Sequence, residues 1–237
     1  ELNYYKKLDQ FLNAKNLPFI KDFLKVKLLD GSASVLDQKL DDLKFDFYGR
    51  TLSGQKEQRA MNKRALSTIN GVLGEAFGKL YVDKYFTAEA KAEMVTLIDY
   101  LKKSYVQHIS NLSWMSDETK TKALDKLSKF TVKVGYPDEW KDYSKLQVLS
   151  KNEGGTLYEN LKNVADWAYQ KELDEVGKKV YKKEWGMTPQ TVNAYYNPVN
   201  NEIVFPAAIL QAHFFDFKAA TAVNLEGIGA VISHENS

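Results

Sequence analysis

A histidine and a glutamate stand next to each other near the C-terminal end of the sequence, at His234 and Glu235, after a largely apolar segment. An imidazole nitrogen can bind zinc, and a carboxylate can take a proton from water, so the two residue types suit metal-assisted hydrolysis. A catalytic zinc ion takes three protein ligands, however, and consecutive side chains leave a helix about 100° apart. The dipeptide alone therefore cannot hold the metal, and by itself it is more simply interpreted as a solvated helix end.

Three further residues are weaker candidates for metal binding. His213 lies between Ala212 and Phe214 and is interpreted as a surface histidine, while His108 lies within a predicted helix and is interpreted as structural. Glu226 is also acidic, but its position in the sequence argues against a ligand role. The sequence contains no cysteine, which excludes disulfides, thiolate nucleophiles and cysteine-bound zinc.

The first 185 residues are predicted to be mainly helical, because apolar side chains recur three and four positions apart. This spacing extends from Leu66 to Leu80 and resumes after Thr87, which is a predicted N-cap. Ser116 is predicted to cap another helix, and a further one is expected from about residue 156 to residue 178. Glycine and proline within residues 135–138 predict a turn between helices.

The sequence changes character after Trp185. Residues 191–196 and 202–205 are rich in β-branched and aromatic side chains, and the turn-forming residues 197–201 lie between them, which predicts a hairpin. Helix is expected again from about residue 219 to the end. The predicted fold class is therefore mainly α with a small β-hairpin (α+β), divided into residues 1–185 and 186–237. The last 50 residues are not expected to bury both faces of a hairpin by themselves.

Composition restricts the function classes. The chain is 44% apolar and 27% charged, which is typical of a folded globular protein and argues against extensive disorder. Its net charge of +2 arises from basic and acidic residues interleaved at helical spacing, so no nucleic-acid partner is expected. No apolar stretch is long enough for a transmembrane segment. The lack of cysteine favours a cytoplasmic location, although a bacterial cell-surface or secreted location also fits.

Six segments resemble the neprilysin family of zinc metalloendopeptidases, and specifically its bacterial oligopeptidase O (PepO) branch. Three occur in the order and at the spacing of the segments that lead into that family's zinc helix: VNAYYNP at 192–198, NEIVFPAAILQ at 201–211 and GIGAVISHE at 227–235. Weaker matches lie at residues 78–82, 112–115 and 135–138. The resemblance covers most of the chain, from about residue 46 to residue 235.

The resemblance implies a gluzincin, in which a helix carries two histidines four positions apart and a distant glutamate completes the Zn²⁺ ligands. By position, His234 matches the first zinc ligand and Glu235 the general base. Asn193 and Ala194 match the strand that holds the oligopeptide substrate. Residues 1–185 would then be part of the family's chamber-forming helical domain, and residues 186–237 the beginning of its zincin catalytic domain.

The family's pattern is incomplete in this sequence. Position 236 is asparagine where the family has an aliphatic residue, the second histidine would be residue 238, and His213 stands where proline is usual. The expectation is an interior fragment that ends inside the zinc motif and is inactive alone, with zinc bound in the complete protein. Two alternatives stay open: a non-catalytic module that binds peptides or a protein, and a chain whose missing ligands come from a second polypeptide.

Overall fold

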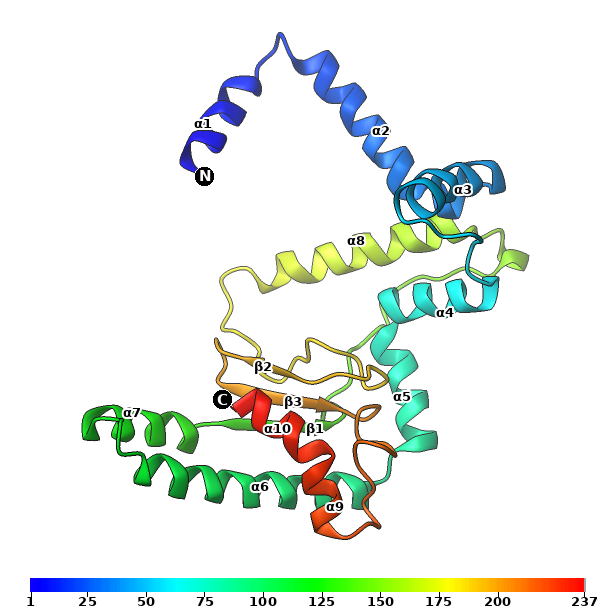
Figure 1. Cartoon of the computed structure of the whole chain (residues 1–237). Helices are drawn as coiled ribbons and strands as arrows, with labels where there is room; N and C mark the ends of the chain where they lie inside the picture. Colours follow the sequence, from blue (N-terminus) through cyan, green and yellow to red (C-terminus); the bar gives the residue numbers. More distant parts are fainter. Residues whose placement is uncertain (237) are drawn as a thin grey trace. The chain divides into compact units, whose positions relative to one another are not determined.

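The computed structural model describes residues 1–236 (Figure 1), so Ser237 at the end of the predicted last helix lies outside the described residues. In chain order the elements are α1 (Leu2–Phe11), α2 (Leu17–Leu36), α3 (Gln38–Lys44), the π-helix η1 (Phe45–Leu52), α4 (Met61–Val72), α5 (Gly74–Tyr85), α6 (Ala88–Asn111), α7 (Asp117–Ser128), β1 (Thr131–Gly135), the 3₁₀-helix η2 (Lys151–Glu153), α8 (Leu157–Glu175), β2 (Tyr195–Asn197), β3 (Glu202–Pro206), α9 (Thr221–Glu226) and α10 (Ile228–Asn236). The predicted fold class, mainly α with a small β component, is confirmed. No helix within residues 1–236 is both long and apolar enough to cross a bilayer.

The chain divides into two compact units. Unit 1 comprises residues 1–64 and 145–174, and unit 2 comprises residues 65–144 and 175–237. The expected boundary at residue 185 falls inside unit 2, because α4 to α7 belong largely to the same unit as the hairpin. The site residues predicted from the sequence all lie in unit 2.

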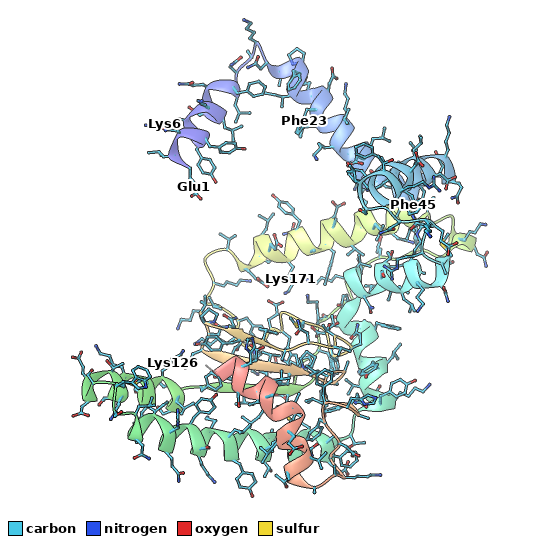
Figure 2. All side chains as sticks on the ribbon, viewed as in Figure 1. Glu1, Lys6, Phe23, Phe45, Lys126 and Lys171 are labelled. Atoms are coloured by element: carbon cyan, nitrogen blue, oxygen red, sulfur yellow. The ribbon has the colours of Figure 1, made fainter. Side chains whose placement is uncertain are left out.

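Unit 1 is built from helices that bury few side chains. Ala33 of α2 and Asp41 of α3 are buried, and Arg64 donates from Nη2 to both carboxylate oxygens of Asp41 at 2.7 Å. Phe23, labelled on α2 in Figure 2, is 52% exposed. Apolar side chains of α1 and α2 are thus largely in contact with solvent in this unit.

Unit 2 contains a three-stranded sheet in the order β1-β3-β2. β1 runs parallel to β3 with Thr131 opposite Glu202, and β2 runs antiparallel to β3 with Tyr196 opposite Ile203. The hairpin β2–β3 was predicted. β1 was not predicted, although Val132 and Val134 alternate with Lys133 as in a half-buried strand.

One face of the sheet carries the main hydrophobic core. Side chains from every second strand position pack against α6 and α10. The two helices also contact each other beside the sheet (Figure 1). The core contains Met94, Leu97 and Ile98 of α6, Val134 of β1, Ile203 and Phe205 of β3, and Ile228 and Ile232 of α10. Residues from before and after position 185 therefore share a single core, as expected if the hairpin cannot bury both faces alone.

The opposite face of the sheet is covered by the irregular segment that precedes β2. Lys133 pairs with the buried Glu202 at 2.9 Å, and its Nζ also donates to the carbonyls of Lys182 and Glu184 at 2.6 and 2.9 Å. The amide of Ala208 donates to the carbonyl of Pro189 at 2.9 Å. These bonds fix the segment on the sheet directly before the predicted substrate strand.

Two predicted helix starts are confirmed and two predicted continuous helices are not. Thr87 accepts a hydrogen bond from the amide of Ala90, and Ser116 caps α7 in the same manner. The pattern from residue 66 to residue 80 is interrupted at Leu73, between α4 and α5. The last helix is interrupted at Gly227, where a Cβ would lie 2.5 Å from the carbonyl oxygen of Phe214.

Candidate functional site

The His-Glu pair lies near the C-terminal end of α10. Ile228 and Ile232, four positions apart, are fully buried against the core, and this fixes which side of the helix faces the sheet. His234 is exposed and Glu235 is half-buried. His234 follows Ile232 by two positions and leaves the opposite side of α10, whereas Glu235 follows Ile232 by three positions and leaves nearly the same side, beyond the last buried turn.

A cleft of about 740 Å³ opens beside Glu235. Its walls come from α6, α7, β2 and α10 and are mainly apolar, with a few polar groups among them. The residues that line it include Ser233 and Glu235 of α10, Tyr105 and His108 of α6, and Tyr196 of β2. The structure therefore brings the predicted base next to the edge strand, within one unit.

Tyr105 links the helix of the His-Glu pair to α6. Its hydroxyl donates to the backbone carbonyl oxygen of Ser233 at 3.0 Å. Tyr105 falls at an apolar position of the helical spacing that resumes after Thr87, so the spacing alone predicts a core residue and not this bond. Only its phenol oxygen could have indicated a hydrogen bond, because a tyrosine hydroxyl in the protein interior is normally paired.

Asn193 and Ala194 lie immediately before β2 and not inside a strand, which corrects the predicted strand of residues 191–196. In the β2–β3 register Asn193 would lie opposite Pro206. Proline has no N–H to donate, so the ladder cannot continue through that pair. Asn193 is exposed and Ala194 is 5% exposed, so only the asparagine side chain faces solvent.

β2 is one of the two outer strands of the three-stranded sheet, and side chains hold it on both faces. Tyr196 stacks on Phe130, with ring centroids 5.8 Å apart, and Lys126 lies 5.0 Å from the same tyrosine ring. On the other face Tyr195 accepts a hydrogen bond from the amide of Gly186 at 2.7 Å. Burial raises the pKa of Tyr195, and the nearby Glu202 carboxylate adds to this, while the Gly186 bond opposes it.

The described residues do not form a zinc site. Within residues 1–236 no three histidine, cysteine, aspartate or glutamate side chains are close enough together to hold a metal ion. His213 is exposed with φ of 84°, as expected for a surface histidine, and Glu226 is exposed at the end of α9. His108, interpreted from the sequence as structural, is exposed on α6 beside the cleft.

Comparison with known proteins agrees with the geometry. Two models of Peptidase family M13 match the chain, one over residues 1–137 and the other over residues 193–237. A neutral endopeptidase of Lactococcus lactis is 35% identical over the whole chain, which covers 37% of that protein. Neprilysin-11 of Caenorhabditis elegans is 30% identical over 99% of the chain, which covers 28% of that protein.

Solved structures give the same assignment. Zinc metalloprotease Zmp1 of Mycobacterium tuberculosis, in complex with an inhibitor, aligns with a TM-score of 0.86 and 44% identity over 98% of this chain and 34% of that one. PepO of Lactobacillus rhamnosis aligns with a TM-score of 0.88 and 31% identity over 97% of this chain and 36% of that one. The chain thus spans between 28% and 37% of the length of these relatives. The resemblance to the neprilysin family is confirmed, and the chain belongs to Peptidase family M13.

Proposed function

We propose that this chain is part of a zinc-dependent metalloendopeptidase that hydrolyses oligopeptides, with Glu235 as the general base and His234 as one of the zinc ligands. The observation that carries the proposal is the position of Glu235, half-buried on the wall of a cleft that the edge strand β2 also lines. The names of its relatives, neutral endopeptidase and zinc metalloprotease, support the same reaction.

Glu235 is suited to proton transfer at a peptide bond. In the proposed reaction its carboxylate takes the proton of the attacking water and passes it to the leaving amine, a role that contributes about 10²- to 10⁴-fold in rate. The cleft gives the carboxylate a partly dry surrounding, which strengthens its interaction with the developing charges. His234, the adjacent residue on α10, is proposed to bind the metal and takes no part in the proton transfer.

The outer position of β2 suits binding of an extended peptide. A substrate in that conformation can pair with the backbone of the segment that leads into β2, as in strand addition to a sheet. The exposed amide of Asn193 can then bind a substrate carbonyl or amide, while the buried Ala194 keeps the backbone close to the sheet.

The proposed activity belongs to the whole protein and not to these 237 residues alone. Since residues 1–236 gather no three metal ligands, we propose that the chain by itself neither retains zinc nor cleaves peptides. Zinc per chain, measured by mass spectrometry after exhaustive dialysis, should be close to zero. A ratio near one, together with chelator-sensitive cleavage by the purified chain, would contradict this part of the proposal.

Peptide hydrolysis by the whole protein tests the role of Glu235. Glu235→Gln should lower kcat by at least about 100-fold while the zinc content stays unchanged. The matched control is Glu226→Gln, which makes the same change at an exposed residue of α9 and should leave kcat unchanged. Equal activity of the two variants would refute the role of Glu235.

The same assays separate catalysis from binding alone. His234→Gln should reduce the zinc content of the whole protein, whereas His213→Gln, at an exposed turn, should not. Peptide affinity without turnover in the zinc-loaded whole protein would instead favour a non-catalytic binding module.

A further inference from the structure

A hydrogen bond joins two helices that are far apart in the sequence. The hydroxyl of Tyr105 on α6 donates to the carbonyl oxygen of Ser233 on α10 over 3.0 Å, across 128 positions of sequence. Both residues are half-buried, and both lie on the wall of the cleft that Glu235 also lines. The bond therefore holds α10 two residues before the predicted base.

The acceptor of this bond belongs to the peptide group that carries the next residue. The carbonyl of Ser233 and the amide nitrogen of His234 lie in one rigid plane, because the peptide bond does not rotate freely. A hydrogen bond to that carbonyl oxygen therefore fixes the orientation of the Ser233–His234 peptide plane, and with it the position of the His234 backbone. A side chain on α6 can in this way control the direction in which His234 and Glu235 leave α10.

The apolar contacts of α10 cannot do this alone. Ile228 and Ile232 are fully buried and hold the earlier turns of the helix against the core, but Ser233 and Glu235 are only half-buried and His234 is exposed. Hydrophobic contact is non-directional and tolerates small rotations of a helix about its axis. A hydrogen bond weakens steeply when its angle is wrong, so it restricts such rotation.

We propose that Tyr105 is a positioning residue, whose hydroxyl sets the rotation of the last turn of α10 and thereby aims His234 and Glu235. The effect on catalysis rests on the proposed function, but the tether, which is the hydrogen bond from Tyr105 to Ser233, does not. Tyr105 is not a catalytic residue in this proposal, because it acts through the backbone of α10.

The first test uses the isotopically labelled 237-residue chain and the conservative variant Tyr105→Phe, which removes only the hydroxyl. The ¹³C shift of the Ser233 carbonyl, detected through the amide of His234, reports the bond directly. Loss of one hydrogen bond of ordinary strength should raise hydrogen exchange of the last-turn amides of α10 about five-fold, with exchange in α6 unchanged. Tyr100→Phe is the control, since it removes a hydroxyl from an exposed tyrosine of the same helix.

The outcomes separate positioning from general stability. A shifted Ser233 carbonyl together with faster exchange confined to the end of α10 supports the proposal. An unchanged carbonyl shift overturns it, and so does faster exchange spread evenly over α6, α10 and the sheet.

The second test uses the zinc-loaded whole protein. Tyr105→Phe should lower kcat, by up to about 100-fold if the base is displaced by an ångström, while KM and zinc content stay unchanged. Tyr100→Phe should match the unsubstituted protein in all three quantities. Unchanged kcat in Tyr105→Phe overturns the aiming role. If the unsubstituted protein has no peptidase activity, the proposed function is overturned instead. The ¹³C shift of the Ser233 carbonyl then still decides whether the tether exists.

Discussion

Replacing Lys133 by methionine should strongly destabilise unit 2. Lys133 lies on β1, and its ammonium group contacts the carboxylate of Glu202 at 2.9 Å. The side chains of Lys133 and Glu202 are 11% and 2% exposed. Methionine keeps much of the length of lysine and removes the charge, so Lys133→Met leaves the Glu202 carboxylate in the sheet without its cation.

The size of the loss follows from this burial. Removing one partner of a buried ion pair costs about 3–5 kcal/mol, because the remaining charge stays desolvated without compensation. Two carbonyls, those of Lys182 and Glu184, lose their donor in addition. Lys133 retains slight contact with solvent, so water can reach the site, and we expect the lower end, about 3 kcal/mol.

Urea unfolding of the 237-residue chain measures the effect. For an m-value of about 2–3 kcal/mol/M the midpoint should fall by about 1 M or more. The matched control is Lys129→Met, which breaks the pair with Asp125, whose two side chains are 70% and 58% exposed. That surface pair should contribute less than about 1 kcal/mol.

A second substitution tests the cause. Adding Glu202→Gln to Lys133→Met removes the unpaired charge and should recover part of the lost stability. If Lys133→Met costs no more than Lys129→Met, or if Glu202→Gln recovers nothing, the argument from the buried carboxylate is refuted.

Two further predictions concern bonds that hold irregular segments of unit 2. Asn224 is 2% exposed, accepts a hydrogen bond from the amide of Asp216 and donates one to the carbonyl of Asp216. Asn224→Ala should therefore lower the free energy of unfolding, measured with urea, by about 2–3 kcal/mol. Hydrogen bonds from Lys183 and Tyr181 hold the pKa of Glu139 below its usual value, so this contact should persist at neutral pH and break as the pH falls through that lowered pKa. The NMR shifts of the Tyr181 ring should follow this transition and should lose it in Glu139→Gln.

Each of these two predictions has a clear contrary result. Replacing the exposed Asn13, which donates to the carbonyl of Gln10, should change stability by less than about 1 kcal/mol, and an equal loss in Asn224→Ala would contradict the burial argument. If the Tyr181 ring shows the same acid transition in Glu139→Gln, a group other than Glu139 controls the contact.

Much of the local structure is determined by short stretches of sequence. The N-caps at Thr87 and Ser116 require only a hydroxyl and the amide three residues later, so the residues themselves predict them. The β2–β3 turn depends likewise on a few neighbouring residues. The family assignment and the placing of His234 and Glu235 at the end of an apolar helix also followed from segments of 7 to 11 residues.

Contacts between distant segments were decided only by the tertiary structure. β1 is a strand because it pairs with β3, some 70 positions later, and its five residues carry too short an alternation to predict this alone. Pro206 ends the β2–β3 ladder through a register that only the pairing reveals, which leaves Asn193 outside the strand. The bond from Tyr105 to Ser233 also depends on the fold. Helical spacing predicts only that an aromatic residue such as Tyr105 packs in the core, and the tertiary structure places a carbonyl opposite its hydroxyl. Sequence patterns repeat over a few residues and so determine local elements, whereas pairing partners depend on where the whole chain brings those elements together.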